Sequence, residues 1–386
     1  MKAAAALATL AATASAHGGL TFPPSRNNFG NQDPTVRTGS KSFHNNGAFC
    51  TGDQCLWFNE GCWIGCPTNC SSKMPANNPN AKGYKKSPEF TRNTYGEPNC
   101  EGWKPMEPTL PEKYRTWNIG NPSPMGDFTK YHPWRAPGRS PTVDPCGVGG
   151  AYLEPEEGGI APQGSKLFAR GSELPVGVRT EWKKGSVEEA AFMLGSNHGG
   201  GYLYSLCPAN ETLTEACFNR QSLPFVGSTH TIRYLDNRTI GAQKEVEFTI
   251  PAVDVNEGTW PAGSAWRLNP IPACNCDQGD SCLNRTVNGS DLTKAYADDG
   301  PPHPKGEIHG SSGNDCPTGT QFPVPFPYGY GQHLWYNLAD GPSRDMWAIV
   351  DQVQVPDITG DFVLRWRWDT EQNPQIWSHC ADVRIV

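Results

Sequence analysis

Alternation of apolar and polar residues is clearest near the end of the chain. From 362 to 368 the even positions are large and apolar, whereas Arg365 and Arg367 occupy odd positions and are expected to face the other way. The segments 381–385 and 246–250 repeat the pattern. A period of two residues is typical of a strand with one buried face, so these segments predict three strands.

A fourth, less regular strand is expected over 346–355. Periodic apolar stripes of the kind found in amphipathic helices are scarce, and glycine (42) and proline (36) together make up about a fifth of the 386 residues. Several short strands separated by turn-forming residues are typical of two packed sheets. The sequence therefore predicts an all-β fold, a β-sandwich with long loops.

Two long stretches, 45–146 and 298–331, are rich in glycine and proline and contain few alternating runs. Because a sandwich needs about 150 to 200 residues, roughly half of the chain is expected to be loop or insertion. Loops of this length are usually functional or held in place by other interactions. No internal repeat or linker separates a second module, so we expect one elaborated domain over 17–386, with its inserts wrapped around the sandwich.

The first sixteen residues have the features of a signal peptide. They contain one basic residue, Lys2, then a short run of Ala, Leu and Thr, and they end in the small residues Ala14-Ser15-Ala16. No later segment approaches eighteen consecutive apolar residues, so the mature chain is expected to be secreted, soluble and free of a membrane span.

Fourteen cysteines follow the leader, and their even number predicts up to seven disulfides in an exported chain. The clustered spacings at 62–70 and 274–282 would also suit zinc in a cytosolic protein, but secretion favours disulfides. Five N-x-S/T sequons fit a secreted glycoprotein. They lie at Asn69, Asn210, Asn237, Asn284 and Asn288.

The net charge of the chain indicates which classes of partner it is expected to bind. With 32 basic and 39 acidic residues the chain has a formal net charge of −7, and cleavage after residue 16 removes one more positive charge, that of Lys2. Nucleic-acid affinity depends on Lys and Arg at phosphates, so an acidic chain without a basic run argues against a nucleic-acid partner. We expect a monomer.

Cleavage after Ala16 would leave His17 as the first residue of the mature chain. A free N-terminal histidine carries two nitrogen donors, the α-amine and the ring Nδ1, in a geometry that chelates copper. The sequence thus predicts a metal ligand that exists only after proteolytic processing.

A second histidine signal is His198, in the run Asn197-His198-Gly199-Gly200-Gly201-Tyr202. Three glycines let the backbone turn tightly and are expected to leave the imidazole uncovered, as an open metal site requires. The alternative is a glycine-rich turn whose histidine only hydrogen-bonds a neighbour. Pairing with a histidine at the mature N-terminus favours the metal site.

A third signal lies close to the C-terminus. If the segment from Gln375 is extended, Gln375, Trp377 and His379 project from one face, and an amide, an indole and an imidazole share one surface. The alternative is a buried aromatic residue with a polar rim. His379 is equally compatible with hydrogen bonding behind the metal ligands and with a structural role.

Together, His17-Gly18-Gly19-Leu20, the glycine-rich motif around His198 and the closing segment 375–383 resemble the lytic polysaccharide monooxygenases, particularly the chitin-binding type-4 domains of eukaryotes. The three segments span residues 17 to 386 in the order typical of that family, but the long inserts match no motif. The resemblance implies an immunoglobulin-like or fibronectin-III-like sandwich with loop insertions pinned by disulfides.

The resemblance also implies a ligand set and roles. His17 would supply its amine and Nδ1, and His198 its Nε2, to one Cu(2+), which favours planar nitrogen donors. Gln375 matches a glutamine that hydrogen-bonds near the oxygen ligand. Trp377 falls where many members have an axial tyrosine or phenylalanine, and an indole there would shield that face and could conduct oxidising equivalents away.

The activity implied by the resemblance is oxidative cleavage of polysaccharide chains at C1 or C4, using O2 or H2O2 and an external electron donor. Chitin, cellulose, xylan, starch and pectin all remain open as substrates. The alternative is a module of the same fold that binds chitin or another glycan without catalysis, or that only carries copper. A purely glycan-binding module would gain nothing from a processed histidine.

Other enzyme classes find little support. No carboxylate pair is placed by a hydrolase motif, and Asp369 and Glu371 are expected to hydrogen-bond loops. The nucleophile-elbow, HExxH, Walker and dinucleotide motifs are missing from the sequence.

The remaining histidines are expected to be surface or packing residues. They are His44, His132, His230, His303, His309 and His333. Trp57, Phe58, Trp63 and the aromatics of 322–330 could either stack on sugar rings or form loop cores.

Overall fold

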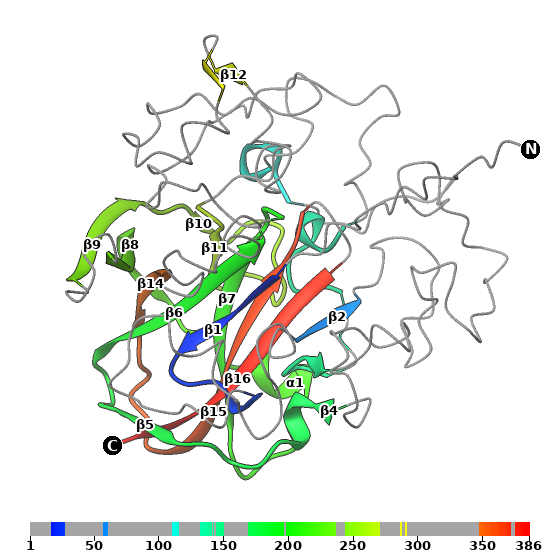
Figure 1. Ribbon diagram of the computed structural model, residues 1–386. Helices are drawn as coiled ribbons and strands as arrows, with labels where there is room; N and C mark the ends of the chain where they lie inside the picture. Colours follow the sequence, from blue (N-terminus) through cyan, green and yellow to red (C-terminus); the bar gives the residue numbers. More distant parts are fainter. Residues whose placement is uncertain are drawn as a thin grey trace, which may run out of the picture.

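The computed structural model has an all-β architecture of two packed sheets (Figure 1). It describes residues 17–27, 57–60, 110–115, 132–140, 142, 144–149, 169–196, 198–236, 244–270, 286–287, 290–291, 347–371 and 375–386. The signal-peptide prediction for residues 1–16 and the insert 298–331 lie outside these residues. None of the described helices has the length and apolar character needed to cross a bilayer.

The smaller sheet has five antiparallel strands and contains the mature N-terminus expected from the sequence. Its order is β1 (His17–Phe22), β6 (Val187–Ser196), β14 (Trp347–Gln354), β8 (Phe225–Asp236) and β9 (Lys244–Pro251). The predicted strands at 246–250 and 346–355 are confirmed as β9 and β14. β1 forms one edge of this sheet, and among the described strands its ladder partner is β6.

The larger sheet has nine strands and is built around β15 and β16. Its order is β10 (Asp254–Val255), β11 (Trp266–Leu268), β7 (Gly201–Pro208), β15 (Gly360–Asp369), β16 (Gln375–Ile385), β2 (Phe58–Glu60), β3 (Val148–Gly149) and β4 (Ala169–Arg170), and β5 (Arg179–Trp182) pairs in parallel with β16. A separate hairpin joins β12 (Thr286–Val287) and β13 (Ser290–Asp291). The two C-terminal strand predictions are confirmed.

The core between the sheets is strongly aromatic. Its largest members come from both sheets and include Phe192, Tyr202, Tyr204, Trp366, Trp368 and Trp377. Even positions of β15 point into this core, as their alternation predicts. On β16, Trp377 faces the core, whereas Cys380 belongs to a cluster on the opposite side. The predicted division of β16 into two faces is therefore confirmed.

The outer face of β15 is also buried, which the alternation does not predict. Arg365 and Arg367 are each 1% exposed. The short helix α1 (Glu215–Phe218) lies over them, and both guanidinium groups contact the carboxylate of Glu215 at 2.7 and 3.2 Å. A charge can be buried when it is paired and hydrogen-bonded, so covering segments replace solvent on this face.

Described parts of the first insert pack against the larger sheet. The 3₁₀ helices η4 (Glu112–Tyr114) and η5 (Pro133–Arg135) contribute Tyr114 and Trp134 to a cluster with Trp266 from β11. A third, η6 (Gly171–Glu173), follows β4 directly.

Two disulfides fasten this outer layer. Cys146 bonds to Cys380 on β16, and Cys207 on β7 bonds to Cys217 in α1. The other ten cysteines lie outside the described residues.

Candidate metal centre

The pairing of β1 with β6 brings the two candidate histidines to one end of the sandwich. His17 begins β1 and lies opposite Ser196, the last residue of β6. His198 follows only two residues later, shortly before β7 begins at Gly201. The register of one antiparallel pair thus places the backbone of residue 17 beside the loop that carries His198. Gln375, the first residue of β16, belongs to the neighbouring part of the larger sheet.

Three carbonyl groups of the loop 198–200 accept hydrogen bonds from other elements. The backbone N–H of Glu371 donates to the carbonyl of His198 at 3.1 Å, and that of Asn269 donates to Gly200 at 2.8 Å. The indole N–H of Trp368 donates to the carbonyl of Gly199 at 2.7 Å. A short loop held at every carbonyl is fixed in position, which a metal ligand requires.

The glycines of this loop are needed for close packing. Gly200 has a φ of +77°, and a Cβ there would lie 2.0 Å from the carbonyl oxygen of Asp369. A Cβ on Gly201 would lie 2.2 Å from the ring of Trp134. The predicted tight turn is therefore confirmed.

The expectation that the glycines leave the imidazole uncovered is wrong. His198 is only 1% exposed. The glycines do not open the turn to solvent but admit close packing, because Asp369 and Trp134 approach Gly200 and Gly201 as closely as glycine allows. The candidate centre is consequently enclosed at His198 and is not an open, flat surface at this residue.

Trp368 contacts both sides of the candidate centre. Besides its hydrogen bond to Gly199, its ring lies against Gly18, where an added Cβ would come within 3.1 Å of Cζ3. The residues next to His17 and next to His198 therefore touch the same indole. Alternation along the strand predicts a core position for Trp368 but gives no sign of this second role.

Gln375 and Trp377 are both buried at this end of the sandwich. Gln375 is 8% exposed, and its carbonyl accepts hydrogen bonds from the hydroxyl and the backbone N–H of Thr370 at 2.8 and 3.3 Å. Trp377 is fully buried between Phe58 and Trp368, with ring centroids 4.7 and 6.2 Å away. Trp377 thus has the buried aromatic environment weighed as an alternative from the sequence.

His379 has a structural position. It is 1% exposed, and its Nδ1 and Nε2 lie 3.3 and 3.1 Å from the backbone N–H groups of Leu20 and Trp57. A neutral imidazole has one acceptor nitrogen, so it accepts one of the two. Burial lowers the pKa of His379 to about 3, so the ring is neutral at physiological pH. His379 therefore links β16 to β1 and to the segment before β2.

Two further histidines are buried packing residues, within the range of roles expected. The ring of His132 is hydrogen-bonded to the carbonyl of Glu371. His230 is fully buried, and its Nδ1 lies 2.9 Å from Asp351 and 3.1 Å from the hydroxyl of Tyr202. Burial raises the pKa of Asp351, but His230 and Arg267 lower it by more, so the carboxylate is charged. His44, His303, His309 and His333 lie outside the described residues.

Asp369 and Glu371 support loops, as predicted. Asp369 pairs with Arg367 at 2.7 Å and accepts from the backbone N–H of Gly138 at 2.8 Å. The sugar-stacking alternative is wrong for Trp57 and Phe58, which are both 2% exposed and belong to the packed interior. Trp63 and 322–330 lie outside the described residues.

The donor set at this end fits a copper ion by its chemistry. Two imidazoles and a terminal amine are nitrogen donors of the type that Cu(2+) prefers. In the part of the chain that is described, His, Cys, Asp and Glu side chains form no group of three or more that could hold a metal. The amine that residue 17 would carry after processing is the further donor expected from the sequence.

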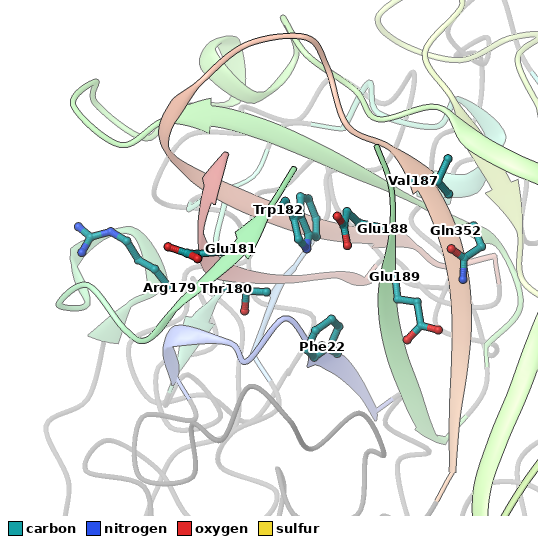
Figure 2. Close-up of a pocket in the computed structure, with 9 residues that line it drawn as sticks. All are labelled: Phe22, Arg179, Thr180, Glu181, Trp182, Val187, Glu188, Glu189 and Gln352. Carbon is teal, nitrogen blue, oxygen red and sulfur yellow. The ribbon is translucent and has the colours of Figure 1, made fainter. Parts of the chain in front are cut away.

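A cavity of about 660 Å³ lies at the opposite end of the same strands (Figure 2). Its lining includes Phe22, the last residue of β1, and Val187, the first residue of β6. Carboxylate side chains also line it. Glu188 accepts from the hydroxyl of Ser186 at 2.7 Å, and Glu189 pairs with Arg233 at 3.0 Å. The predicted site residues are not among those that line this cavity.

Comparison with known proteins gives one distant similarity. No family model matches the chain. The chain is 24% identical over 213 residues to a protein named AA13 family lytic polysaccharide monooxygenase A from Aspergillus terreus (strain NIH 2624 / FGSC A1156). The match covers 53% of this chain and 40% of that relative, so the chain spans less than half of the relative's length. This supports a distant relationship to lytic polysaccharide monooxygenases, whereas the finer resemblance to chitin-binding type-4 domains stays a prediction.

Proposed function

We propose that this protein is a secreted copper-dependent monooxygenase that cleaves polysaccharide chains oxidatively. The observation that carries the proposal is the β1–β6 register, in which residue 17 lies opposite Ser196 and thus beside the His198 loop. The distant similarity to a lytic polysaccharide monooxygenase supports the same class of activity. In this proposal residues 17–386 form one elaborated domain.

Processing of the leader makes the site competent. In the proposal, His17 supplies its amine and Nδ1 to Cu(2+), and His198 supplies its Nε2. The amine becomes a ligand only after the peptide bond before His17 is cut, so removal of residues 1–16 is an activation step. An amine with an ordinary pKa of about 7.7 to 8.0 must lose a proton to bind, so affinity falls in acid.

When bound, copper supplies redox chemistry that, with O2 or H2O2 and an external electron donor, oxidises a C–H bond at C1 or C4 beside a glycosidic bond. The protein's own residues shape the surroundings. Gln375 offers a neutral amide that can donate a hydrogen bond without adding a competing charge. Trp377 would help to exclude water from the metal site, because it is fully buried.

Three neighbouring tryptophans lie near the candidate centre, with Trp368, which contacts Gly18 and Gly199, between the other two. The ring centroids of Trp377 and Trp368 are 6.2 Å apart, and those of Trp368 and Trp366 are also 6.2 Å apart. Indoles are readily oxidised, so these tryptophans give oxidising equivalents a path away from the histidine ligands when no substrate is bound. Trp377 is connected to the candidate centre through Trp368, which contacts Gly18 and Gly199, and this supports the exit role considered for Trp377.

The second candidate function is a module of the same fold that binds chitin or another glycan, or that carries copper, without catalysis. The enclosed position of His198, at 1% exposure, favours it more than an open site would. The partners in the main proposal are a polysaccharide, such as chitin, cellulose or another glycan, and an external reductant.

The test is product analysis with the mature protein. Protein beginning at His17 is loaded with copper and incubated with a reductant, H2O2 and a panel of polysaccharides, and the soluble products are analysed by mass spectrometry. We expect oxidised oligosaccharides from at least one polysaccharide, and none from the His198→Ala variant. Copper binding without any oxidised product would overturn the proposal in favour of the carrier. Glycan binding without copper binding would favour the glycan-binding module.

A further inference from the structure

Among the tryptophans whose side chains are described, one lies at the surface and the others are buried. Trp260 is 43% exposed, whereas the seven other tryptophans whose side chains are described are each at most 2% exposed. A single exposed apolar residue needs no explanation by itself. The surroundings of Trp260 suggest a binding role, because several contacts hold this exposed ring in a fixed position.

The turn that carries Trp260 is anchored to two other segments. Its backbone N–H donates to the carbonyl of Pro137 at 2.8 Å, and the guanidinium of Arg139 lies 4.8 Å from its ring centroid. Glu257, in the same turn, pairs with Lys113 at 2.8 Å. Because Arg139 covers one face of the indole, the exposed area belongs to the opposite face and the edges.

Close backbone packing beside Trp260 also restricts its position. Gly138 has a φ of +81°, and a Cβ there would lie 2.1 Å from the carbonyl oxygen of Trp260. Only glycine allows this approach. A ring that is already held in place loses little conformational freedom when a ligand stacks on it, which favours affinity.

Contacts connect Trp260 to the candidate metal centre. The backbone N–H of Gly138, in the segment that holds Trp260, donates a hydrogen bond to the carboxylate of Asp369. The carbonyl of Asp369 lies against Gly200, in the loop that follows His198. Trp260 is therefore connected, through Gly138 and Asp369, to the loop that follows His198, on the side of the larger sheet.

We propose that Trp260, backed by Arg139, is a stacking platform for a pyranose ring of a polysaccharide that extends toward the candidate metal centre. This inference rests on the proposed function for the class of ligand and deepens it by naming a glycan-binding residue. Of the aromatic residues weighed for this role from the sequence, Trp57 and Phe58 are buried and cannot fill it, and Trp63 and those of 322–330 lie outside the described residues.

The chemistry of this surface suits a neutral sugar. A pyranose ring has an apolar face of C–H groups that packs flat on an indole, and its hydroxyl groups stay in contact with water or polar side chains. Near Trp260, Glu257 is paired with Lys113, and the cation of Arg139 lies over the ring. The net charge of −7 also disfavours stacking on nucleic-acid bases.

The test is a binding assay on copper-free protein, so that it does not depend on catalysis. Wild type, Trp260→Ala and Val253→Ala are incubated with insoluble chitin, cellulose, xylan and starch, and the unbound protein is measured. Val253 is a matched control because it is 39% exposed and apolar and lies between β9 and β10. For the polysaccharide that wild type binds best, we expect Trp260→Ala to raise the dissociation constant about tenfold and Val253→Ala to leave it unchanged.

A second variant tests whether a loss of binding by Trp260→Ala is caused by misfolding. Trp260→Phe keeps a smaller ring and is expected to bind with intermediate affinity, while thermal unfolding of all three variants stays close to that of wild type. Unchanged binding by Trp260→Ala, or wild type that binds none of the polysaccharides, would overturn the inference. Loss of glycan binding in Trp260→Ala together with wild type that binds no copper would leave the platform intact and overturn the proposed function instead.

Discussion

The indole N–H of Trp368 donates a hydrogen bond to the carbonyl of Gly199 at 2.7 Å, while the same ring lies against Gly18. Gly18 follows His17 and Gly199 follows His198, so one buried side chain spans the two chain segments that carry the candidate metal ligands. The spacing between those segments depends on this ring. Trp368 is therefore a positioning residue in the proposed site.

Trp368→Phe keeps most of the ring but removes the hydrogen bond to Gly199. We expect the dissociation constant for copper to rise about tenfold, because a buried carbonyl loses its partner and the loop can shift. Trp366→Phe is the matched control, since the indole N–H of Trp366 has no hydrogen-bond partner among the described residues. Calorimetric titration and the copper EPR spectrum measure the effect. Equal changes in the two variants would contradict the positioning role.

Gly200→Ala tests the packing of the His198 loop. The added Cβ would meet the carbonyl of Asp369 at 2.0 Å, at a residue whose φ is +77°. We expect a loss of about 3 kcal/mol in the free energy of unfolding, from the clash and the strained φ together. Gly227→Ala is the control, because Gly227 has the same φ of +77° but nothing within 4 Å of an added Cβ. Gly227→Ala should lower the free energy of unfolding, measured with denaturant, by only about 1 kcal/mol. Similar losses would show that the clash is relieved.

The buried His379 predicts a dependence of stability on pH. Its pKa in the folded protein is lowered to about 3 by burial. The unfolded chain binds a proton at this residue below about pH 6.5, whereas the folded protein does not, so the free energy of unfolding falls by about 1.4 kcal/mol per pH unit below pH 6.5. The loss continues until the pH approaches 3.

His379→Asn removes this titration. In urea unfolding measured between pH 6 and pH 4.5, the variant should show a slope smaller by about 1.4 kcal/mol per pH unit, whatever its stability at neutral pH. An unchanged slope would contradict the neutral, buried state of His379.

Glu215 stabilises the arginines buried on the outer face of β15. Burial raises its pKa, but Arg365 and Arg367 lower it by more, to about 2. We expect Glu215→Gln to lower the free energy of unfolding by about 3 kcal/mol, because two buried cations lose a counter-charge. Glu211→Gln breaks an exposed pair with Arg220 and should change stability by less than about 1 kcal/mol. Thermal and denaturant unfolding compare the two. Equal effects would mean that solvent already screens Glu215.

Local alternation was enough to predict the strands of the sandwich. Phe362, Leu364 and Val383 lie on the inner faces of β15 and β16, as a period of two residues requires. The same pattern correctly placed Arg365 and Arg367 on the opposite face but did not predict that this face is buried, because alternation describes one strand and carries no information about a distant helix that covers its polar face. Glu215 lies 150 residues from Arg365 in the sequence.

Only those features of the candidate site that depend on short sequence motifs were predicted from the sequence. His198 and its glycine turn could be identified because the required backbone conformation is local. The burial of His198 could not, since burial depends on how distant segments pack around the turn, as Asp369 and Trp134 do at Gly200 and Gly201. The link between Trp368 and Gly199 joins residues 169 positions apart. Trp260 was missed because neither its neighbours in the sequence nor its residue type distinguishes it from the buried tryptophans.

The most direct test of the central claim is a copper titration of two proteins that differ by one residue at the N-terminus. One begins at His17, and the other carries a single glycine before His17, which converts the amine of His17 into a peptide nitrogen. The first protein should bind one Cu(2+), and the second should bind it about a hundredfold more weakly. Equal affinities, or no copper binding by the protein that begins at His17, would contradict the account.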